Sequence, residues 1–178
     1  MKPIKGYNTA TASGQYEKLA PGGYVIKITE VRDEEDKQRL VYLYDIAEGP
    51  EKGRYTTEKM EFRHSFYAYY TEKAVGLFKS FIQAIDETNG TELGKTVETG
   101  LNEQLLVGKL VGAVIAYEEY DATDGTTKQR PYVSRYLTAD KVRQGAFKIP
   151  ELKRAKGSAA TQAIPSGFTP MKDEDVPF

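Results

Sequence analysis

Aromatic and cationic side chains occur together in this sequence, most densely in residues 54–70. Flat rings can stack on unpaired bases, and lysine or arginine beside them can neutralise backbone phosphates. These residue types therefore favour reversible binding of a single nucleic-acid strand, to which each stacked base contributes about 1–3 kcal/mol. The candidate strand-binding residues are Tyr42, Tyr44, Arg54, Tyr55, Lys59, Phe62, Arg63, Phe66, Tyr67, Tyr69, Lys128, Arg130, Tyr132 and Arg135.

The same rings have a second, purely structural interpretation. Aromatic residues are good strand formers, and the interior of a small barrel needs bulky side chains. For this reason we expect roughly half of the candidate rings to belong to the core. The acidic run at residues 33–36 falls in the first hairpin turn, where it would repel phosphate or simply face solvent.

Catalytic chemistry has less support in the sequence. The chain has no cysteine and a single histidine, His64, so a cysteine nucleophile and a thiolate metal site are excluded. Residues 94–96 read Gly-Lys-Thr, but three residues separate them from the preceding glycine where a phosphate-binding loop needs four. A small metal-dependent nuclease built on Asp45 or Glu48 stays an alternative. The sequence predicts no catalytic residue, no metal and no cofactor.

The composition is that of a soluble intracellular protein. Its 178 residues suffice for one ordinary domain with an appendage, and no apolar run approaches the ~20 residues that span a membrane. The 25 basic residues are balanced by 26 acidic ones, whereas a dedicated duplex binder is usually more basic. The first residues lack the apolar region of a secretory signal. We expect a cytoplasmic location and no membrane partner.

Five strands and one helix must position the candidate residues. Apolar residues at i, i+3 and i+4 between 74 and 85 predict an amphipathic helix, with a stop at Asn89-Gly90. Gly108 and Gly112 indicate a bend or bulge in the fourth strand. The predicted strands cover residues 24–31, 40–46, 54–70, 105–120 and 130–137.

This order of elements predicts a mainly β protein, a five-stranded OB-fold-like barrel with one helix between strands 3 and 4 and a disordered C-terminal tail. An α+β sandwich with the helix on one face is the alternative, because strand order cannot be read from one sequence. The predicted organisation is a flexible N-terminal arm at 1–19, an OB-fold single-stranded DNA-binding domain at 20–150, a flexible linker at 151–171 and an acidic protein-interaction tip at 172–178.

The segment KDEDVPF at residues 172–178 combines three acids with an apolar end. A pocket with an apolar floor and a cationic rim could take the ring of Phe178 and pair with its terminal carboxylate, which is an established mode of peptide recognition. The predicted partner-binding residues are Asp173, Glu174, Asp175, Val176, Pro177 and Phe178.

The stretch DEDVPF resembles the acidic C-terminal tip of bacterial single-stranded DNA-binding proteins, in which aspartates are followed by Ile-Pro-Phe. Glu174 and Val176 are conservative departures, and the other four residues match in kind. In that family the tip recruits replication, recombination and repair proteins, while an OB-fold binds the strand. The resemblance implies the same division of labour here.

The segments YDIAEGPEKGR, LVGKLVGAVI and VRQGAFKIPELK are similar to phage and prophage proteins that are often thought to bind single strands. The chain lacks the tryptophans and the Gly/Gln-rich tail of the ordinary bacterial family. The resemblances imply a phage-encoded, sequence-nonspecific single-stranded DNA-binding protein for replication and recombination, acting in the bacterial host cytoplasm. A replication or recombination adaptor that binds only protein is the alternative, and self-association into a homo-oligomer stays open.

Overall fold

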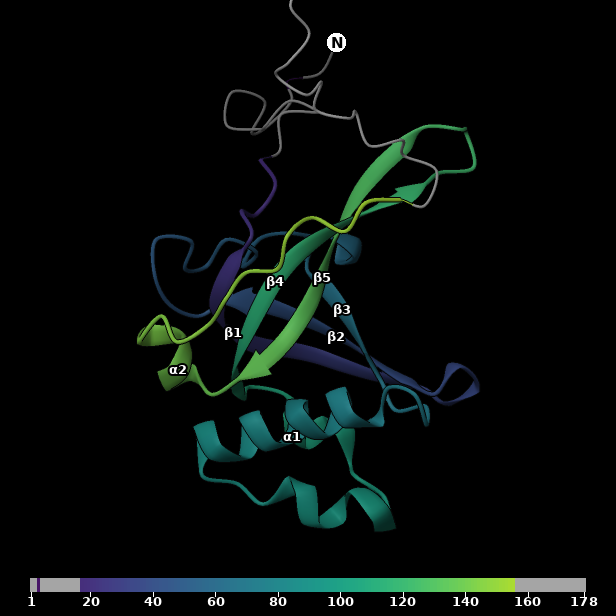
Figure 1. Cartoon of the computed structure of the whole chain (residues 1–178). Helices are drawn as coiled ribbons and strands as arrows, with labels where there is room; N and C mark the ends of the chain where they lie inside the picture. The colour runs from purple at the N-terminus through teal and green to yellow at the C-terminus, as the bar shows by residue number, and fades with distance from the viewer. Residues whose placement is uncertain (1–2, 4–16, 156–178) are drawn as a thin grey trace, which may run out of the picture.

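The computed structural model describes residue 3 and residues 17–155 (Figure 1). Within them, no helix is long and apolar enough to cross a membrane. Four short 3-10 helices in this part of the chain occupy three of the connections. The strands and α-helices are β1 (Gly22–Glu34), β2 (Arg39–Ile46), β3 (Ser65–Tyr69), α1 (Val75–Asn89), β4 (Leu110–Asp121), β5 (Thr127–Leu137) and α2 (Ala139–Arg143). The predicted helix and its stop at Gly90 are confirmed, because that glycine adopts the left-handed conformation as the C-cap of α1.

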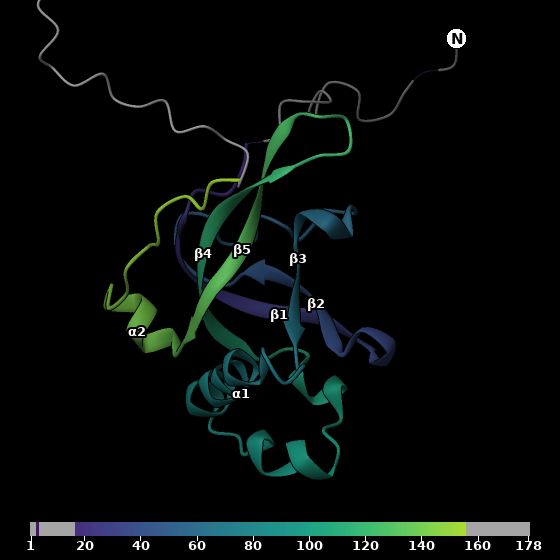
Figure 2. The same ribbon diagram turned by 45° about the vertical axis from the view of Figure 1, so that its right-hand side comes forward.

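The five strands form one antiparallel sheet in the order β3-β2-β1-β4-β5. The prediction of a mainly β protein with five strands and a helix between the third and fourth is therefore confirmed. The edge strands β3 and β5 are not paired with each other, so the described residues form an open sheet rather than a closed barrel. Figures 1 and 2 show α1 lying across one end of the strands.

The open sheet is strongly curled. The hydroxyl oxygens of Tyr42 in β2 and Tyr136 in β5 lie 2.7 Å apart in a buried hydrogen bond, although β1 and β4 separate these two strands in the sheet. Register shifts in the β1–β2 and β4–β5 pairs supply local bends. The ring of Phe81 in α1 stacks on Tyr42 at 5.3 Å and lies 4.7 Å from Tyr136. The helix thereby fills the interior that the curl creates.

Residues 54–70 do not form the single strand predicted for them. Only Ser65–Tyr69 is a strand, and a turn and a 3-10 helix precede it. The carboxylate of Asp45, near the end of β2, accepts hydrogen bonds from the backbone N–H of Tyr55 at 2.8 Å and from the hydroxyl of Thr56 at 2.6 Å. Because these bonds hold the chain back against the end of β2, the aromatic residues at 54–64 form a connection instead of a strand.

The fourth strand begins at Leu110, later than predicted, because Gly108 turns the chain with a φ of 83° before it. Asn89 fixes this start: its side chain accepts from the backbone N–H of Leu110 at 3.0 Å and donates to the carbonyl of the same residue at 2.8 Å. The end of α1 is thereby joined to the beginning of β4.

Gly112 provides the first test of this packing. A Cβ at this position would lie 2.6 Å from a methyl carbon of Val142 and 2.8 Å from the carbonyl oxygens of Leu137 and Thr138. Since backbone atoms must move to make room, we expect Gly112→Ala to lower the free energy of unfolding by about 1–3 kcal/mol, measured by urea denaturation. Gly76→Ala is the matched control, because a Cβ there meets nothing within 4 Å; a similar loss in both variants would contradict the packing.

Both ends of the described chain are attached to β4. The buried Leu19, within the predicted arm, accepts a hydrogen bond on its carbonyl from the hydroxyl of Tyr117 at 2.7 Å. Lys153, within the predicted linker, accepts a hydrogen bond from the backbone N–H of Glu119, also at 2.7 Å. The other residues of the predicted arm and linker, and the whole predicted tip at 172–178, lie outside the described residues apart from a few neighbours of these anchors.

Candidate nucleic-acid interface

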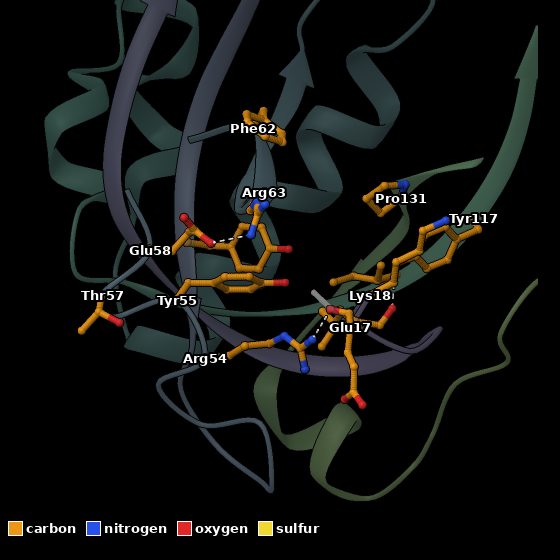
Figure 3. A pocket seen from close by; sticks show the side chains of 13 residues that line it. Glu17, Lys18, Arg54, Tyr55, Thr57, Glu58, Phe62, Arg63, Tyr117 and Pro131 are labelled. Carbon is orange, nitrogen blue, oxygen red and sulfur yellow. Dashed lines mark hydrogen bonds and ion pairs between the residues drawn. The ribbon is translucent and has the colours of Figure 1, made fainter. Parts of the chain in front are cut away.

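A cavity of about 720 Å³ opens between the connection that precedes β3 and the strands β4 and β5. We call it the mouth pocket (Figure 3). Its lining combines residues beside β3, at one edge of the sheet, with residues of β5, at the other edge. These residues lie close together because the sheet is curled. Its lining includes Glu17, Lys18, Tyr44, Arg54, Tyr55, Glu58, Phe62, Arg63, Tyr117 and Pro131.

The predicted strand-binding residues that line this pocket are Tyr44, Arg54, Tyr55, Phe62 and Arg63. Figure 3 shows the side chains of the β2–β3 connection on one side and those of Tyr117 and Pro131 on the other. The sequence prediction missed these last two residues, which lie opposite one another in the β4–β5 register. Their role depends on strand pairing, and no local sequence signal marks it.

The rings of the pocket are held in place and partly accessible. Tyr55 is half-buried, stacks on His64 at 5.5 Å and meets Tyr44 edge to face, also at 5.5 Å. Burial raises the pKa of the Tyr55 phenol, so it stays protonated at neutral pH. Phe62 is 74% exposed, which is far more than is usual for a core phenylalanine. These two rings offer surfaces on which a flat ligand could stack.

Guanidinium groups stand beside these rings. Arg54 forms an ion pair with Glu51 and donates a hydrogen bond to the backbone carbonyl of Glu17. Arg63 pairs with Glu58 at 3.2 Å, and its guanidinium carbon lies 5.7 Å from the Phe62 ring centroid. The pocket therefore combines flat rings with cations, but acidic groups accompany the cations.

Asp45 is the residue that positions Tyr55, through the two hydrogen bonds described above. We expect Asp45→Ala to lower the free energy of unfolding by about 1–3 kcal/mol, since the backbone N–H of Tyr55 loses its acceptor. Urea denaturation measures the loss. Asp36→Ala in the exposed first hairpin turn is the control and is expected to be neutral. Equal effects in the two variants would show that Asp45 does not hold this connection.

Tyr42 and Phe66 are core residues rather than base contacts. The side chains of Tyr42 and Phe66 are 0% and 6% exposed, so no base can reach their faces. Tyr44 lines the inner wall of the mouth pocket but is itself 2% exposed and stacks on Phe66 at 5.0 Å. Of the predicted rings, these three therefore support the site from within.

Tyr67 and Tyr69 belong to a different surface. Side chains alternate along β3, so these rings point away from the buried Phe66 and Ala68 and face outward. The guanidinium carbon of Arg39 lies 4.0 Å from the Tyr67 ring centroid, and Arg39 donates a hydrogen bond to the Tyr69 hydroxyl at 3.0 Å. We call these three residues the outer-face cluster. Arg39 was absent from the predicted site.

The remaining predicted residues lie in β5, except Lys59, which lies in the connection between β2 and β3. Arg130 pairs with Glu118 across the hairpin at 2.8 Å, and Lys128 pairs with Asp124 at 2.7 Å. Tyr132 is half-buried, with the Lys153 amine 4.1 Å from its ring centroid. Lys59 and Arg135 are exposed and do not line the mouth pocket.

The residues of the alternative nuclease make structural contacts. Asp45 accepts the bonds that hold Tyr55, and Glu48 forms an ion pair with Arg143 at 2.6 Å. In the described residues there is no group of three or more histidines and carboxylates that could hold a metal ion.

Comparison with models of known protein families finds none that matches this chain. Comparison with curated proteins finds no match either.

Proposed function

We propose that this protein binds single-stranded DNA without sequence preference, at the mouth pocket, as a phage-type binding protein in replication and recombination. The observation that carries the proposal is a single cavity where the accessible rings and guanidinium groups of residues 54–63 face Tyr117 and Pro131, which come from a distant part of the chain. A single strand offers both unstacked bases for Tyr55 and Phe62 and phosphates for Arg54 and Arg63. Binding is stoichiometric and involves no turnover.

The arrangement of the strands supports an OB-like fold as part of this proposal. An OB-fold is a partly open five-stranded barrel that binds oligonucleotides on the face of strands 2 and 3 and on nearby loops. Here the curled sheet, with α1 across one end, has the right number of strands and leaves a gap between β3 and β5. The mouth pocket lies along the connection between β2 and β3, close to that expected binding region.

Titration with oligo-dT of graded length tests the function. The chain has 13 tyrosines and no tryptophan, so its intrinsic emission reports directly on tyrosine stacking. We expect oligo-dT to quench this emission, with a length dependence that gives the site size. If micromolar protein binds neither oligo-dT nor duplex at about 50 mM salt, the proposal fails and the protein-only adaptor becomes the better hypothesis. Metal-dependent cleavage of either DNA would favour the nuclease.

The segment 172–178 lies outside the described residues, and its role remains a proposal from sequence. We propose that its acids and the Phe178 ring bind replication, recombination or repair proteins through an apolar pocket with a cationic rim. Phe178→Ala should abolish retention of such proteins by the immobilised chain and leave oligo-dT binding unchanged. Retention by the variant equal to that of the parent would contradict this role.

A further inference from the structure

Several cations that a strand would meet at the mouth pocket or along the hairpin already form an ion pair with an acid, among them Arg54, which pairs with Glu51. Arg63 pairs with Glu58, and Arg130 pairs with Glu118 across the β4–β5 hairpin. The same holds for Lys128, whose partner is Asp124. A phosphate that approaches these groups therefore competes with a carboxylate that is already in place.

Glu58 and Glu118 are well placed to resist this competition. One carboxylate oxygen of Glu58 accepts from the backbone N–H of Met60 at 2.9 Å, while the other accepts from Arg63 at 3.2 Å. The hydrogen bond from Met60, followed by the charge of Arg63, lowers the pKa of Glu58, which is ionised at neutral pH. Glu118 is fixed by register, because it lies directly opposite Arg130 in the ladder.

Single-stranded DNA and duplex DNA compete with these carboxylates through different interactions. A single strand can stack its bases on Tyr55 and Phe62, and this gain does not depend on freeing a cation. A duplex keeps its bases paired and stacked, so it must bind mainly through phosphate contacts. The duplex also has a higher charge density, with one phosphate per ~1.7 Å of helix axis. A fixed carboxylate beside each cation therefore lowers the affinity for duplex more than the affinity for a single strand.

We infer that Glu58 and Glu118 are specificity-determining residues, whose carboxylates hold Arg63 and Arg130 and thereby set a preference for single strands over duplex. The inference rests on the proposed function.

The test compares Glu58→Gln, Glu118→Gln and the double variant with the parent chain, using fluorescently labelled oligo-dT and a labelled duplex of equal length. The amide keeps the shape of each side chain and removes its charge. In the double variant we expect duplex affinity to rise about tenfold and oligo-dT affinity only about threefold at about 50 mM salt. For each arginine that loses its carboxylate partner, the slope of log affinity against log salt should steepen by about 0.9 for duplex and by about 0.7 for oligo-dT.

Glu92→Gln is the matched control. Glu92 is also paired with a cation, Lys95, and its replacement changes the net charge as much as either single variant does. It lies in the segment that follows α1, at the opposite end of the molecule from the β4–β5 hairpin (Figure 1). We expect this variant to change duplex and oligo-dT affinity by the same small factor.

The possible outcomes distinguish a failure of the specificity role of Glu58 and Glu118 from a failure of the proposed DNA-binding function. If the parent chain binds oligo-dT but the ratio of the two affinities is unchanged in the variants, the specificity role is wrong and the proposed function stands. If the ratio changes as much in Glu92→Gln, the effect is one of net charge, and the specificity role is again wrong. If the parent binds neither DNA, the proposed function fails and the specificity role fails with it. Should Glu58→Gln reduce thermal stability, the variant in β4, Glu118→Gln, decides alone.

Discussion

Replacing Tyr55 and Phe62 together with alanine should weaken binding of oligo-dT at least about thirtyfold. Each ring of the mouth pocket is accessible to a base, and each stacked base contributes about 1–3 kcal/mol, so the pair contributes about 2 kcal/mol or more. Neither ring belongs to the fully buried part of the core, so the variant should keep its fold. Fluorescence anisotropy with a labelled oligo-dT measures the loss without relying on the tyrosines that are removed.

The outer-face cluster supplies the control. Tyr67 and Tyr69 are 48% and 41% exposed, they come from the same region of sequence, and they carry a neighbouring arginine in Arg39. The double variant Tyr67→Ala/Tyr69→Ala removes a similar ring area from the opposite side of β3. We expect it to change affinity less than about threefold, because these rings lie outside the pocket. A larger loss here than at Tyr55 and Phe62 would place the binding surface on the outer face of the sheet.

The second large effect is a loss of stability in alkaline solution. Burial raises the pKa of the Tyr42, Tyr44 and Tyr136 phenols well above the ordinary value of 10.0. In the unfolded chain these groups ionise from about pH 10, whereas in the folded protein they keep their protons. Their contribution to stability is therefore complete below pH 10 and is lost as the pH rises further. Each phenol accounts for about 1.4 kcal/mol per pH unit, so the three together account for about 4.

Urea denaturation at several pH values, with tyrosinate absorbance as a second signal, measures this loss. The free energy of unfolding should be level near neutral pH and should fall steeply above about pH 10. Tyr136→Phe should reduce the slope by about 1.4 kcal/mol per pH unit, and should cost about 0.5–1.5 kcal/mol at neutral pH through the lost hydrogen bond to Tyr42. Ionisation of all 13 tyrosines without unfolding would show that these three rings reach solvent.

Local periodicity predicted much of this fold. The repeat of apolar residues at 74–85 gave α1, because a helix that packs on one face must show that spacing. Alternation and turn residues also predicted the number of strands and their succession along the chain, but not their order in the sheet. The strand predicted for residues 54–64 was wrong. Their aromatic composition is typical of a strand, but the carboxylate of Asp45 holds the chain in a turn. That contact joins residues ten positions apart and leaves no mark on composition.

The division of the rings between core and surface depended on information that the sequence does not carry. Along β2, Val41 and Leu43 are buried as well as Tyr42 and Tyr44, so alternation does not reveal which face is inward. Along β3 the alternation is clear: Phe66 is buried and Tyr67 is exposed, as the period of two requires. Tyr117 and Pro131 join the pocket only through the β4–β5 register and the curl of the sheet. The open gap between β3 and β5 follows from the same three-dimensional features.

The attachment of both chain ends to β4 has a mechanical consequence. Leu19 is tied to Tyr117 and Lys153 to Glu119, so the two attachments lie two residues apart on a single strand. A force that pulls the flanking segments in opposite directions enters and leaves the fold at this one place. The load is carried first by these hydrogen bonds beside the mouth pocket and by the packing of Leu19, which belongs to the buried core. Tension between whatever the two flanking segments hold would peel Lys153 from β4 before it strained the sheet.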